Sequence, residues 1–241
     1  NISYPAQFIF ENLAIQNNVI HFAYLYKVKK LLFFASACTY PRESPQPMKE
    51  EYLLSGYLEP TNEPYAVAKI AGIKMCQAYN RQYGTNFICG VPTNVYGPGD
   101  NFDPENSHVI PSLISKFHIA KINKDAFATV WGTGNCRRQF IYVDDIADAS
   151  IFLMNNYDNS EIINLGTEYD VTIKELVDIV KEVVGYEGKV VFDISKPDGI
   201  PRKMLDVSRM KGIGWEAKTP LKEGIRRTYE WYKNYSEKIK V

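Results

Sequence analysis

The chain has 241 residues, 45% of them hydrophobic, which is enough to bury a substantial core in one large domain or two modest ones. Its 28 basic and 28 acidic side chains cancel, so no overall charge attracts nucleic acid or an anionic membrane, and an anionic ligand needs a local group of cations. No apolar run approaches the ~20 residues that span a bilayer, and the four cysteines show neither zinc-ligand spacing nor a disulfide framework. We therefore expect a cytoplasmic protein that binds no metal, no nucleic acid and no membrane.

Helix-like and strand-like segments alternate along the chain. Apolar residues at helical spacing predict one helix or two short ones over residues 5–26, and the wholly apolar run 30–35 predicts a strand buried on both faces of a parallel sheet. Further helices are expected at residues 64–83, 112–120, 143–155, 172–184 and 220–235, and further strands at 86–91, 129–131, 140–142, 162–165 and 189–193. This alternation predicts an α/β fold with a parallel sheet and an attached lobe.

Local signals mark the ends of helices and one long loop. Gly84 is placed to end the helix over 64–83, and Thr172 followed three residues later by Glu175 has the pattern of a capping box. The stretch 92–111 holds too many Pro, Gly, Asn and Asp residues for regular structure. Because long connections in compact proteins are often functional, we interpret this stretch as a ligand loop.

Tyr65 and Lys69 lie four residues apart on a predicted helix, which places both side chains on one face. A nearby ammonium favours the phenolate and lowers the pKa of a tyrosine, so this pair could exchange a proton with a carbonyl oxygen. A lone Y-x-x-x-K is more often a solvated helix face. Here, however, the helix follows a predicted buried strand that ends in Ser36-Ala37-Cys38, and the Ser36 hydroxyl could hold a substrate carbonyl beside the tyrosine.

Five segments, in order, resemble the GDP-L-fucose synthase family of the extended short-chain dehydrogenase/reductases, which belong to the NAD-dependent epimerase/dehydratases. They are S-A-C-T-Y-P, E-P-T-N-E-P-Y-A-V-A-K-I-A-G-I-K-M-C, P-T-N-V-Y-G-P-G-D-N-F, N-S-H-V-I-P and P-D-G-I-P-R-K-M-L-D-V. The resemblance implies a Rossmann-like fold, NADP(H) as cofactor and GDP-4-keto-6-deoxy-D-mannose as substrate. It implies epimerisation of the sugar at C3 and C5 before reduction at C4, with Ser36, Tyr65 and Lys69 serving the reduction.

The same resemblance gives Cys38 and His108 the epimerisation. Cys38 would be the base that removes the protons next to the ketone, and His108 the acid that returns a proton on the other face. A thiol titrates near about 8.5 and an imidazole near about 6.5, so both can exchange protons near neutral pH once their surroundings adjust their pKa values. Taken alone, Cys38 would more often be a small buried hydrophobe and His108 a hydrogen-bonding loop residue.

The remaining site residues also follow from the resemblance. Lys116, Arg138 and Lys203 match positions that bind the nucleotide diphosphate, and Trp131 matches one that packs near the sugar nucleotide. Pro92, Asn94 and Val95 match a loop beside the nicotinamide half of the cofactor. Taken singly, each cation is an ordinary surface side chain and Trp131 could be core. We expect structural roles for Cys76, Cys89 and Cys136.

The cofactor fingerprint of the superfamily, a glycine-rich turn after the first strand, does not occur in this sequence. We therefore expect an N-terminally incomplete Rossmann-like sheet in a fragment of a longer enzyme, with a smaller α/β substrate-binding lobe. The expected cofactor domain comprises residues 1–95 and about 138–166, and the expected substrate lobe about 96–137 and 167–241. By analogy with the family, we also expect a homodimer.

Two other functions remain open from the sequence. A different nucleotide-sugar epimerase or dehydratase would share Tyr65 and Lys69 without needing Cys38 and His108. An inactive nucleotide-sugar-binding fragment would bind the GDP-sugar and turn nothing over.

Overall fold

A computed structural model describes residues 4–103 and 107–239, and the chain divides into two compact units. Unit 1 comprises residues up to Thr93 together with Ile146–Glu168 and Met204–Ala217. Unit 2 comprises Asn94–Asp145, Tyr169–Lys203 and the chain from Lys218 onward. Within the described residues, no helix has the length and apolar character needed to cross a membrane.

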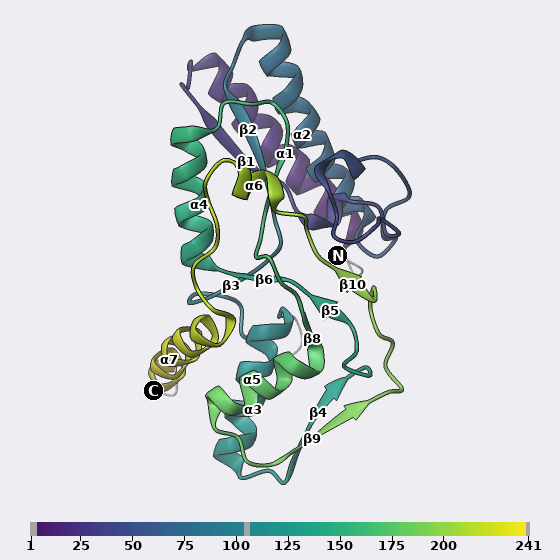
Figure 1. The fold of residues 1–241 in the computed structure, drawn as a ribbon, viewed down its shortest axis with the longest axis vertical. Coiled ribbons are helices and arrows are strands. Elements are labelled where there is room, and N and C mark those ends of the chain that lie inside the picture. Colours follow the sequence, from purple (N-terminus) through teal and green to yellow (C-terminus); the bar gives the residue numbers. More distant parts are fainter. Residues whose placement is uncertain (1–3, 104–106, 240–241) are drawn as a thin grey trace. The chain divides into compact units, whose positions relative to one another are not determined.

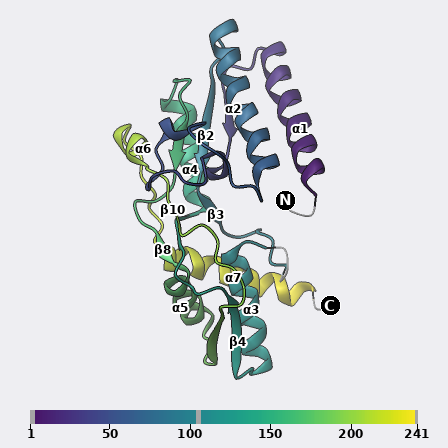
Figure 2. The same cartoon turned by 90° about the vertical axis from the view of Figure 1, so that its right-hand side faces the viewer.

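Unit 1 is built on a parallel sheet of three strands in the order β1-β2-β7. The strands are β1 (Leu31–Phe34), β2 (Phe87–Pro92) and β7 (Ile163–Leu165), with Leu31 opposite Phe87 and Gly90 opposite Ile163. Its helical elements are α1 (Pro5–Leu25), the 3-10 turns η1 (Ala37–Thr39) and η2 (Glu50–Tyr52), α2 (Glu63–Tyr83), most of α4 (Val143–Asn156) and α6 (Ser208–Gly212). Helices α1 and α2 lie side by side (Figures 1 and 2).

The core of unit 1 lies between the sheet and these helices, and it includes Ile20, Ile73 and Phe87. Gly72 lets α2 approach the sheet closely, because a Cβ atom there would lie 2.3 Å from Cζ of Phe33. The expected burial of the first strand on both faces is only partly met, since Phe34 is 37% exposed. The reason is that β1 pairs with β2 along one edge only, within the described part of the chain.

The described residues of unit 2 form three small sheets. Strand β3 (Asn94–Tyr96) pairs in parallel with β6 (Phe140–Tyr142), and β4 (Phe127–Trp131) with β9 (Lys189–Asp193). The third sheet has the order β10-β5-β8, formed by β10 (Arg202–Lys203), β5 (Arg137–Arg138) and β8 (Val171–Thr172). Helices α3 (Val109–Asn123), α5 (Ile173–Val184) and α7 (Leu221–Ile239) complete the unit, and its core includes Ile114, Phe117, Leu176 and Ile225.

The α/β fold class is confirmed, as are the long helices and strands to within a few residues at most ends. Gly84 ends α2 in the left-handed conformation, with φ 67°. The capping box of α5 is present, because the Glu175 N–H donates to Thr172 Oγ1 at 3.0 Å and the Thr172 N–H donates to Glu175 Oε2 at 2.7 Å.

Several short elements were not expected. Strand β3 lies within the stretch 92–111 that was predicted to be irregular, and part of that stretch (104–106) lies outside the described residues. The strands β5, β8 and β10 have only two residues each, too few for a pattern of alternation to be seen. The two compact units also differ from the expected domains, because residues 138–145 fall in unit 2 and 204–217 in unit 1.

Candidate functional site

Unit 1 brings Ser36, Cys38, Tyr65 and Lys69 together at the carboxyl end of β1. Ser36 follows this strand and begins the turn η1, where its hydroxyl oxygen accepts a hydrogen bond from the Cys38 N–H at 3.2 Å. The turn is closed by the Thr39 N–H, which donates to the Ser36 carbonyl at 3.0 Å. The backbone of this turn thus fixes the spacing of the Ser36 hydroxyl and the Cys38 thiol.

Helix α2 supplies the other two side chains from one face. The Lys69 ammonium donates to the Phe34 carbonyl at 3.1 Å, and it lies 5.2 Å from the ring centre of Phe33 and 5.8 Å from that of Tyr65. Phe8 of α1 packs edge-on against Tyr65, with ring centres 6.4 Å apart. Tyr65 and Lys69 are both half-buried, so they are held by packing and still reachable by a ligand.

The pKa of Tyr65 is raised above its ordinary value, which corrects the expectation that Lys69 would lower it. Burial is the largest cause, the negative charge of a Cys38 thiolate is the second, and a hydrogen bond with the Ser36 side chain opposes both. Lys69 lies over the ring and points at the Phe34 carbonyl, and burial lowers the pKa of its own ammonium. Tyr65 is therefore a protonated hydrogen-bond donor at neutral pH.

The four cysteines fall into two groups. Cys38 is partly exposed, whereas Cys76, Cys89 and Cys136 are buried. A hydrogen bond with Cys76, followed by burial, raises the pKa of the Cys89 thiol. A buried thiol whose pKa is raised stays protonated and unreactive, which agrees with the structural role expected for Cys89.

A buried amide, Asn164 of β7, ties two segments of unit 1 to the sheet: the connection between β1 and α2, and the chain at Asp206. Its side-chain N–H groups donate to the carbonyls of Met48 and Asp206, both at 3.0 Å. Its side-chain oxygen accepts from the Tyr40 hydroxyl at 2.6 Å, and its backbone N–H donates to Glu50 Oε1 at 3.0 Å. Because Tyr40 is two residues from Cys38, its hydrogen bond to Asn164 holds the C-terminal end of the Ser36–Cys38 turn.

Pro92, Asn94 and Val95, the residues expected beside the cofactor, straddle the boundary between the units. Pro92 ends β2 in unit 1, where it lies opposite Leu165. Asn94 and Val95 belong to β3 in unit 2, and the side chain of Asn94 donates to the Gln139 carbonyl at 2.8 Å.

In unit 2, Lys116 and Trp131 lie near each other. The Lys116 ammonium donates to the carbonyl of Thr129, two residues before Trp131 on β4, at 2.7 Å, and burial lowers the pKa of this lysine. Trp131 is 69% exposed, and the Lys196 ammonium lies 5.5 Å from its ring centre. An exposed indole flanked by a cation is suited to a planar, anionic ligand, and Lys196 was not singled out from the sequence.

Arg138 and Lys203 are register partners on the parallel strands β5 and β10. The Arg138 guanidinium donates to the carbonyls of Ile200 at 2.6 Å and Arg137 at 2.8 Å. Gly199 leaves room for it, because a Cβ atom at this position would lie 2.9 Å from Arg138 Nη2. Two of the cations predicted from the sequence are therefore adjacent in space.

His108 is exposed and directly precedes α3 in unit 2. Its side chain makes no capping hydrogen bond to that helix. Among the residues that the structure describes, no cluster of three or more His, Cys, Asp or Glu side chains is arranged to hold a metal ion.

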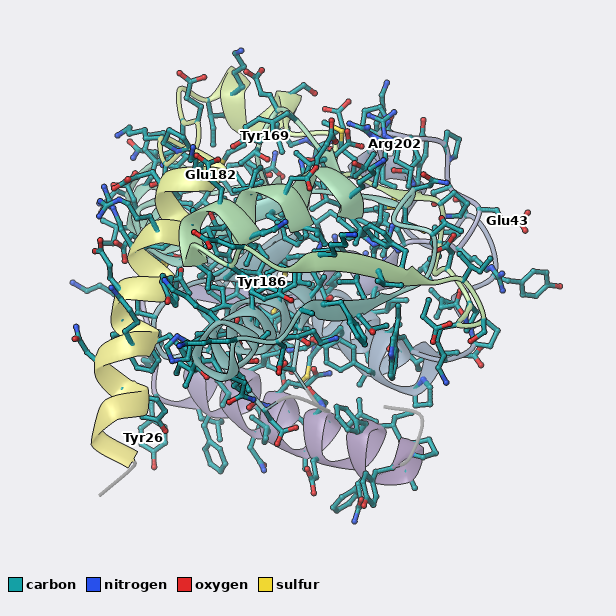
Figure 3. The ribbon with its side chains drawn as sticks, turned by 90° about the horizontal axis from the view of Figure 1, so that it is seen from below. Tyr26, Glu43, Tyr169, Glu182, Tyr186 and Arg202 are labelled. Atoms are coloured by element: carbon teal, nitrogen blue, oxygen red, sulfur yellow. The ribbon has the colours of Figure 1, made fainter. Side chains whose placement is uncertain are left out.

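Sequence reasoning missed the polar residues that hold these groups in place. Asn164 lies in a segment read only as a strand, and Asp170 lies in a linker with no pattern of its own. Asp170 binds the guanidinium groups of both Arg137 and Arg202, the latter labelled in Figure 3. Tyr40 and Gly199 did carry a signal, since they belong to the quoted segments S-A-C-T-Y-P and P-D-G-I-P-R-K-M-L-D-V.

The fold and the Ser-Tyr-Lys group define an α/β protein of the Rossmann-like reductase and epimerase class. The chain belongs to the NAD dependent epimerase/dehydratase family, whose model matches residues 1–166. The resemblance drawn from the five motifs is thereby confirmed at the level of the family.

Curated relatives and solved structures agree with this assignment. The chain is 56% identical to GDP-L-fucose synthase 1 of Arabidopsis thaliana over 96% of its own length and 72% of that protein. It superposes on an NADP-bound GDP-L-fucose synthetase from Naegleria fowleri with a TM-score of 0.93 and 30% identity, covering 97% of this chain and 75% of that one. A GDP-6-OMe-4-keto-L-xylo-heptose reductase from Campylobacter jejuni gives a TM-score of 0.92 and 41% identity, with coverage of 98% and 79%.

Proposed function

We propose that this chain carries the activity of a GDP-L-fucose synthase. It would epimerise GDP-4-keto-6-deoxy-D-mannose at C3 and C5 and then reduce the C4 ketone with NADPH. The observation that carries the proposal is the group in unit 1, where a partly exposed thiol, Cys38, lies on the same turn as Ser36 and beside Tyr65 and Lys69. Reduction alone needs the tyrosine and the lysine, whereas the thiol adds a base for the epimerisation.

In the reduction, Tyr65 gives its phenolic proton to the C4 oxygen while Ser36 holds that oxygen by a hydrogen bond. The raised pKa of Tyr65 suits this direction, because the phenol must be protonated when the ketone is reduced. When bound, NADPH supplies the hydride. The residues present fit its nicotinamide ribose, because an ammonium has three N–H groups and Lys69 uses one on Phe34, leaving donors for ribose hydroxyls.

In the epimerisation, the Cys38 thiolate removes the proton from the carbon next to the ketone, and a proton returns on the other face. The charge of that thiolate is one reason why the pKa of Tyr65 is raised, which supports a short separation between the Cys38 thiol and the Tyr65 hydroxyl. The assignment of His108 as the returning acid rests on the sequence resemblance.

We assign the nucleotide of the GDP-sugar to unit 2. A GDP-sugar brings a diphosphate to a chain whose net charge is zero, so local cations must bind it. Lys116, Arg138 and Lys203 are the cations we assign to this role, and the exposed indole of Trp131 would pack against the sugar nucleotide. The neighbouring pair formed by Arg138 and Lys203 supports the assignment.

We also propose a cytoplasmic homodimer. Helix α1 presents a stripe of exposed apolar side chains at helical spacing, which supports burial against a second copy. The members of this stripe are Ile15, Val19, Phe22 and Leu25. Sedimentation of the purified chain tests it, and a monomer at micromolar concentration would contradict it.

The reaction is tested in two separate assays. NADPH absorbance with GDP-4-keto-6-deoxy-D-mannose follows the reduction, and deuterium uptake at C3 and C5 in heavy water without NADPH follows the epimerisation. Cys38→Ser should lower the deuterium uptake by roughly 10²–10⁴-fold, the usual contribution of a general base. Tyr65→Phe should lower NADPH oxidation to a similar degree and leave deuterium uptake within a few-fold of wild type.

The competing functions give different results. A reductase or a sister epimerase would turn over without Cys38-dependent uptake at C3 and C5. A binding module would bind GDP and the GDP-sugar and show neither exchange nor NADPH oxidation. Either result would overturn the proposed function.

A further inference from the structure

Asp170 gathers the two arginines that precede the proposed diphosphate cations. The Arg137 Nε–H donates to Asp170 Oδ1 and the Arg137 Nη2–H to the Asp170 carbonyl, both at 2.9 Å. The Arg202 Nε–H donates to the other carboxylate oxygen, Asp170 Oδ2, at 2.5 Å. The Asp170 side chain is only 5% exposed, whereas those of Arg137 and Arg202 are 39% and 42% exposed.

The side-chain contacts of Asp170 connect all three strands of this small sheet. Asp170 directly precedes the edge strand β8, Arg137 lies on the central strand β5, and Arg202 lies on the opposite edge strand β10. Because each strand is two residues long, few backbone hydrogen bonds set their register. The side-chain contacts of Asp170 therefore carry a large share of the connection between them.

Each arginine held by Asp170 is followed by one of the proposed ligand-binding cations. Arg137 lies opposite Arg202 in the parallel register, and Arg138 lies opposite Lys203. Successive side chains on a strand point to opposite faces, so Asp170 holds one face while Arg138 and Lys203 occupy the other. Fixing the first face fixes the direction in which the second pair projects.

Charge explains why a carboxylate is needed. Like charges directly opposite on neighbouring strands repel, and this register places cations opposite each other twice. Burial raises the pKa of Asp170, but the hydrogen bonds and charges of Arg137 and Arg202 outweigh it and hold that pKa below its ordinary value. Asp170 is therefore ionised at neutral pH and neutralises the repulsion on its own face.

We propose that Asp170 is a positioning residue that sets the register of β5 and β10, so that Arg138 and Lys203 converge on the diphosphate of the nucleotide ligand. The inference rests on the proposed function, because the diphosphate belongs to the GDP-sugar. It assigns Asp170 no contact with the ligand.

The test compares the binding of GDP with that of guanosine, which lacks the diphosphate, by calorimetry. Asp170→Asn keeps the size of the side chain and removes its charge, and it should weaken GDP binding about tenfold while guanosine binding stays within about twofold. Arg202→Gln leaves Asp170 and Arg137 paired and should weaken GDP binding by a smaller factor. The matched control is Glu182→Gln, which breaks an exposed ion pair with Lys222 in the same unit and should leave both affinities unchanged; Glu182 and Arg202 are labelled in Figure 3.

Two more variants separate this inference from the proposed function. Arg138→Met removes a proposed diphosphate cation outright. Gly199→Ala places a methyl group against the flexible end of Arg138, which can shift cheaply, so GDP binding should weaken with no loss of thermal stability.

Each pattern of results has one meaning. Selective loss of GDP affinity in Asp170→Asn and Arg202→Gln supports the positioning role. Wild-type GDP affinity in these two variants, with weakened binding in Arg138→Met, overturns the positioning role and leaves the proposed function standing. An equal loss of GDP and guanosine binding also overturns it, because that is the mark of a general structural defect. Wild-type GDP affinity in Arg138→Met overturns the proposed diphosphate site and the inference with it.

Discussion

Asn164 in unit 1 and Asp170 in unit 2 both connect separate segments of the chain, the first through an amide and the second through a carboxylate. Each is a single side chain that ties segments distant in the sequence to a short strand. Asn164 does so with a neutral amide, fully buried, that bonds mainly to backbone and neutral groups. Asp170 does so with a carboxylate between two guanidinium groups that remain about two-fifths exposed.

The two side chains differ in chemistry because their surroundings differ in exposure to water. An amide can be buried at low cost when all its donors and acceptors are paired, and water and salt do not reach it. An ion pair keeps its partners near water, where it can be screened but can also hold cations close to one another. The proposed catalytic turn has the first kind of support, and the proposed cationic ligand site has the second.

The largest expected effect is the loss of stability when Asn164, the neutral anchor, is replaced. Asn164→Leu would leave the Tyr40 hydroxyl and the carbonyls of Met48 and Asp206 without their side-chain partner, and we expect the free energy of unfolding to fall by roughly 3–5 kcal/mol. Chemical denaturation measures it. Asn156→Leu, which removes an exposed amide that bonds within α4, is the control and should change stability by less than about 0.5 kcal/mol. A similar loss in both variants would mean that Asn164 is no special anchor.

The ionic anchor should matter less for stability and should depend on salt. Asp170→Asn is expected to lower the unfolding free energy by about 1–2 kcal/mol at low salt, and by less at high salt because its arginines are partly exposed. The Asp170 pKa lies below its ordinary value of 3.8, so this stabilisation is present above that value and is lost as pH falls through the folded-state pKa. An effect that is independent of both salt and pH would contradict the ionic account.

A smaller effect is expected when one hydrogen bond to the Asn164 side chain is removed. Tyr40→Phe loses the hydroxyl that bonds to Asn164 and should cost about 1 kcal/mol. Because Tyr40 is close in sequence to Cys38, deuterium uptake at C3 and C5 should also slow. Tyr186→Phe, which loses a hydroxyl bonded to the Asp125 carbonyl in unit 2, is the control for a lost hydroxyl and should leave the uptake unchanged. Equal rates of deuterium uptake in both variants would show that Tyr40 does not support the turn that carries Cys38.

The smallest effect has the opposite sign. Burial raises the pKa of Glu50 above its ordinary value of 4.5, so the folded chain holds this proton more tightly and ionised Glu50 costs stability as pH rises. Glu50→Gln keeps the oxygen that accepts from Asn164 and should stabilise the chain by roughly 0.5 kcal/mol near neutral pH. The gain should vanish below about pH 4.5. Thermal unfolding across this range measures it, and a loss of stability at neutral pH would contradict the sign.

The sequence predicted those parts of the fold and site that depend on local pattern. The α/β alternation, the capping box at Thr172 and the pairing of Tyr65 with Lys69 on one helix face all follow from spacing along the chain. Ser36 and Cys38 were expected at the end of the first strand, and the structure places them on the turn that follows β1. Local spacing suffices here because each group lies on one helix or one turn.

What the sequence did not predict depends on burial and on partners far along the chain. The direction of the Tyr65 pKa shift was wrong because it depends on where the Lys69 ammonium points and on how deeply the phenol is buried. Asp170 was missed because its partners, Arg137 and Arg202, are 33 and 32 residues away on strands too short to leave a pattern. Neither quantity can be read from residue types alone.

The positions of the tryptophans give each unit its own optical signal. Unit 1 has one tryptophan, the buried Trp215, whose indole N–H donates to Asp148 at 2.7 Å. Unit 2 has the solvent-exposed Trp131 and also Trp231, which stacks on Tyr235. With Trp131 and Trp231 replaced by phenylalanine, fluorescence reports unit 1 alone, and with Trp215 and Trp231 replaced it reports unit 2 through its proposed nucleotide site. Each unit can then be followed by itself in its own variant, both during unfolding and as nucleotide is added.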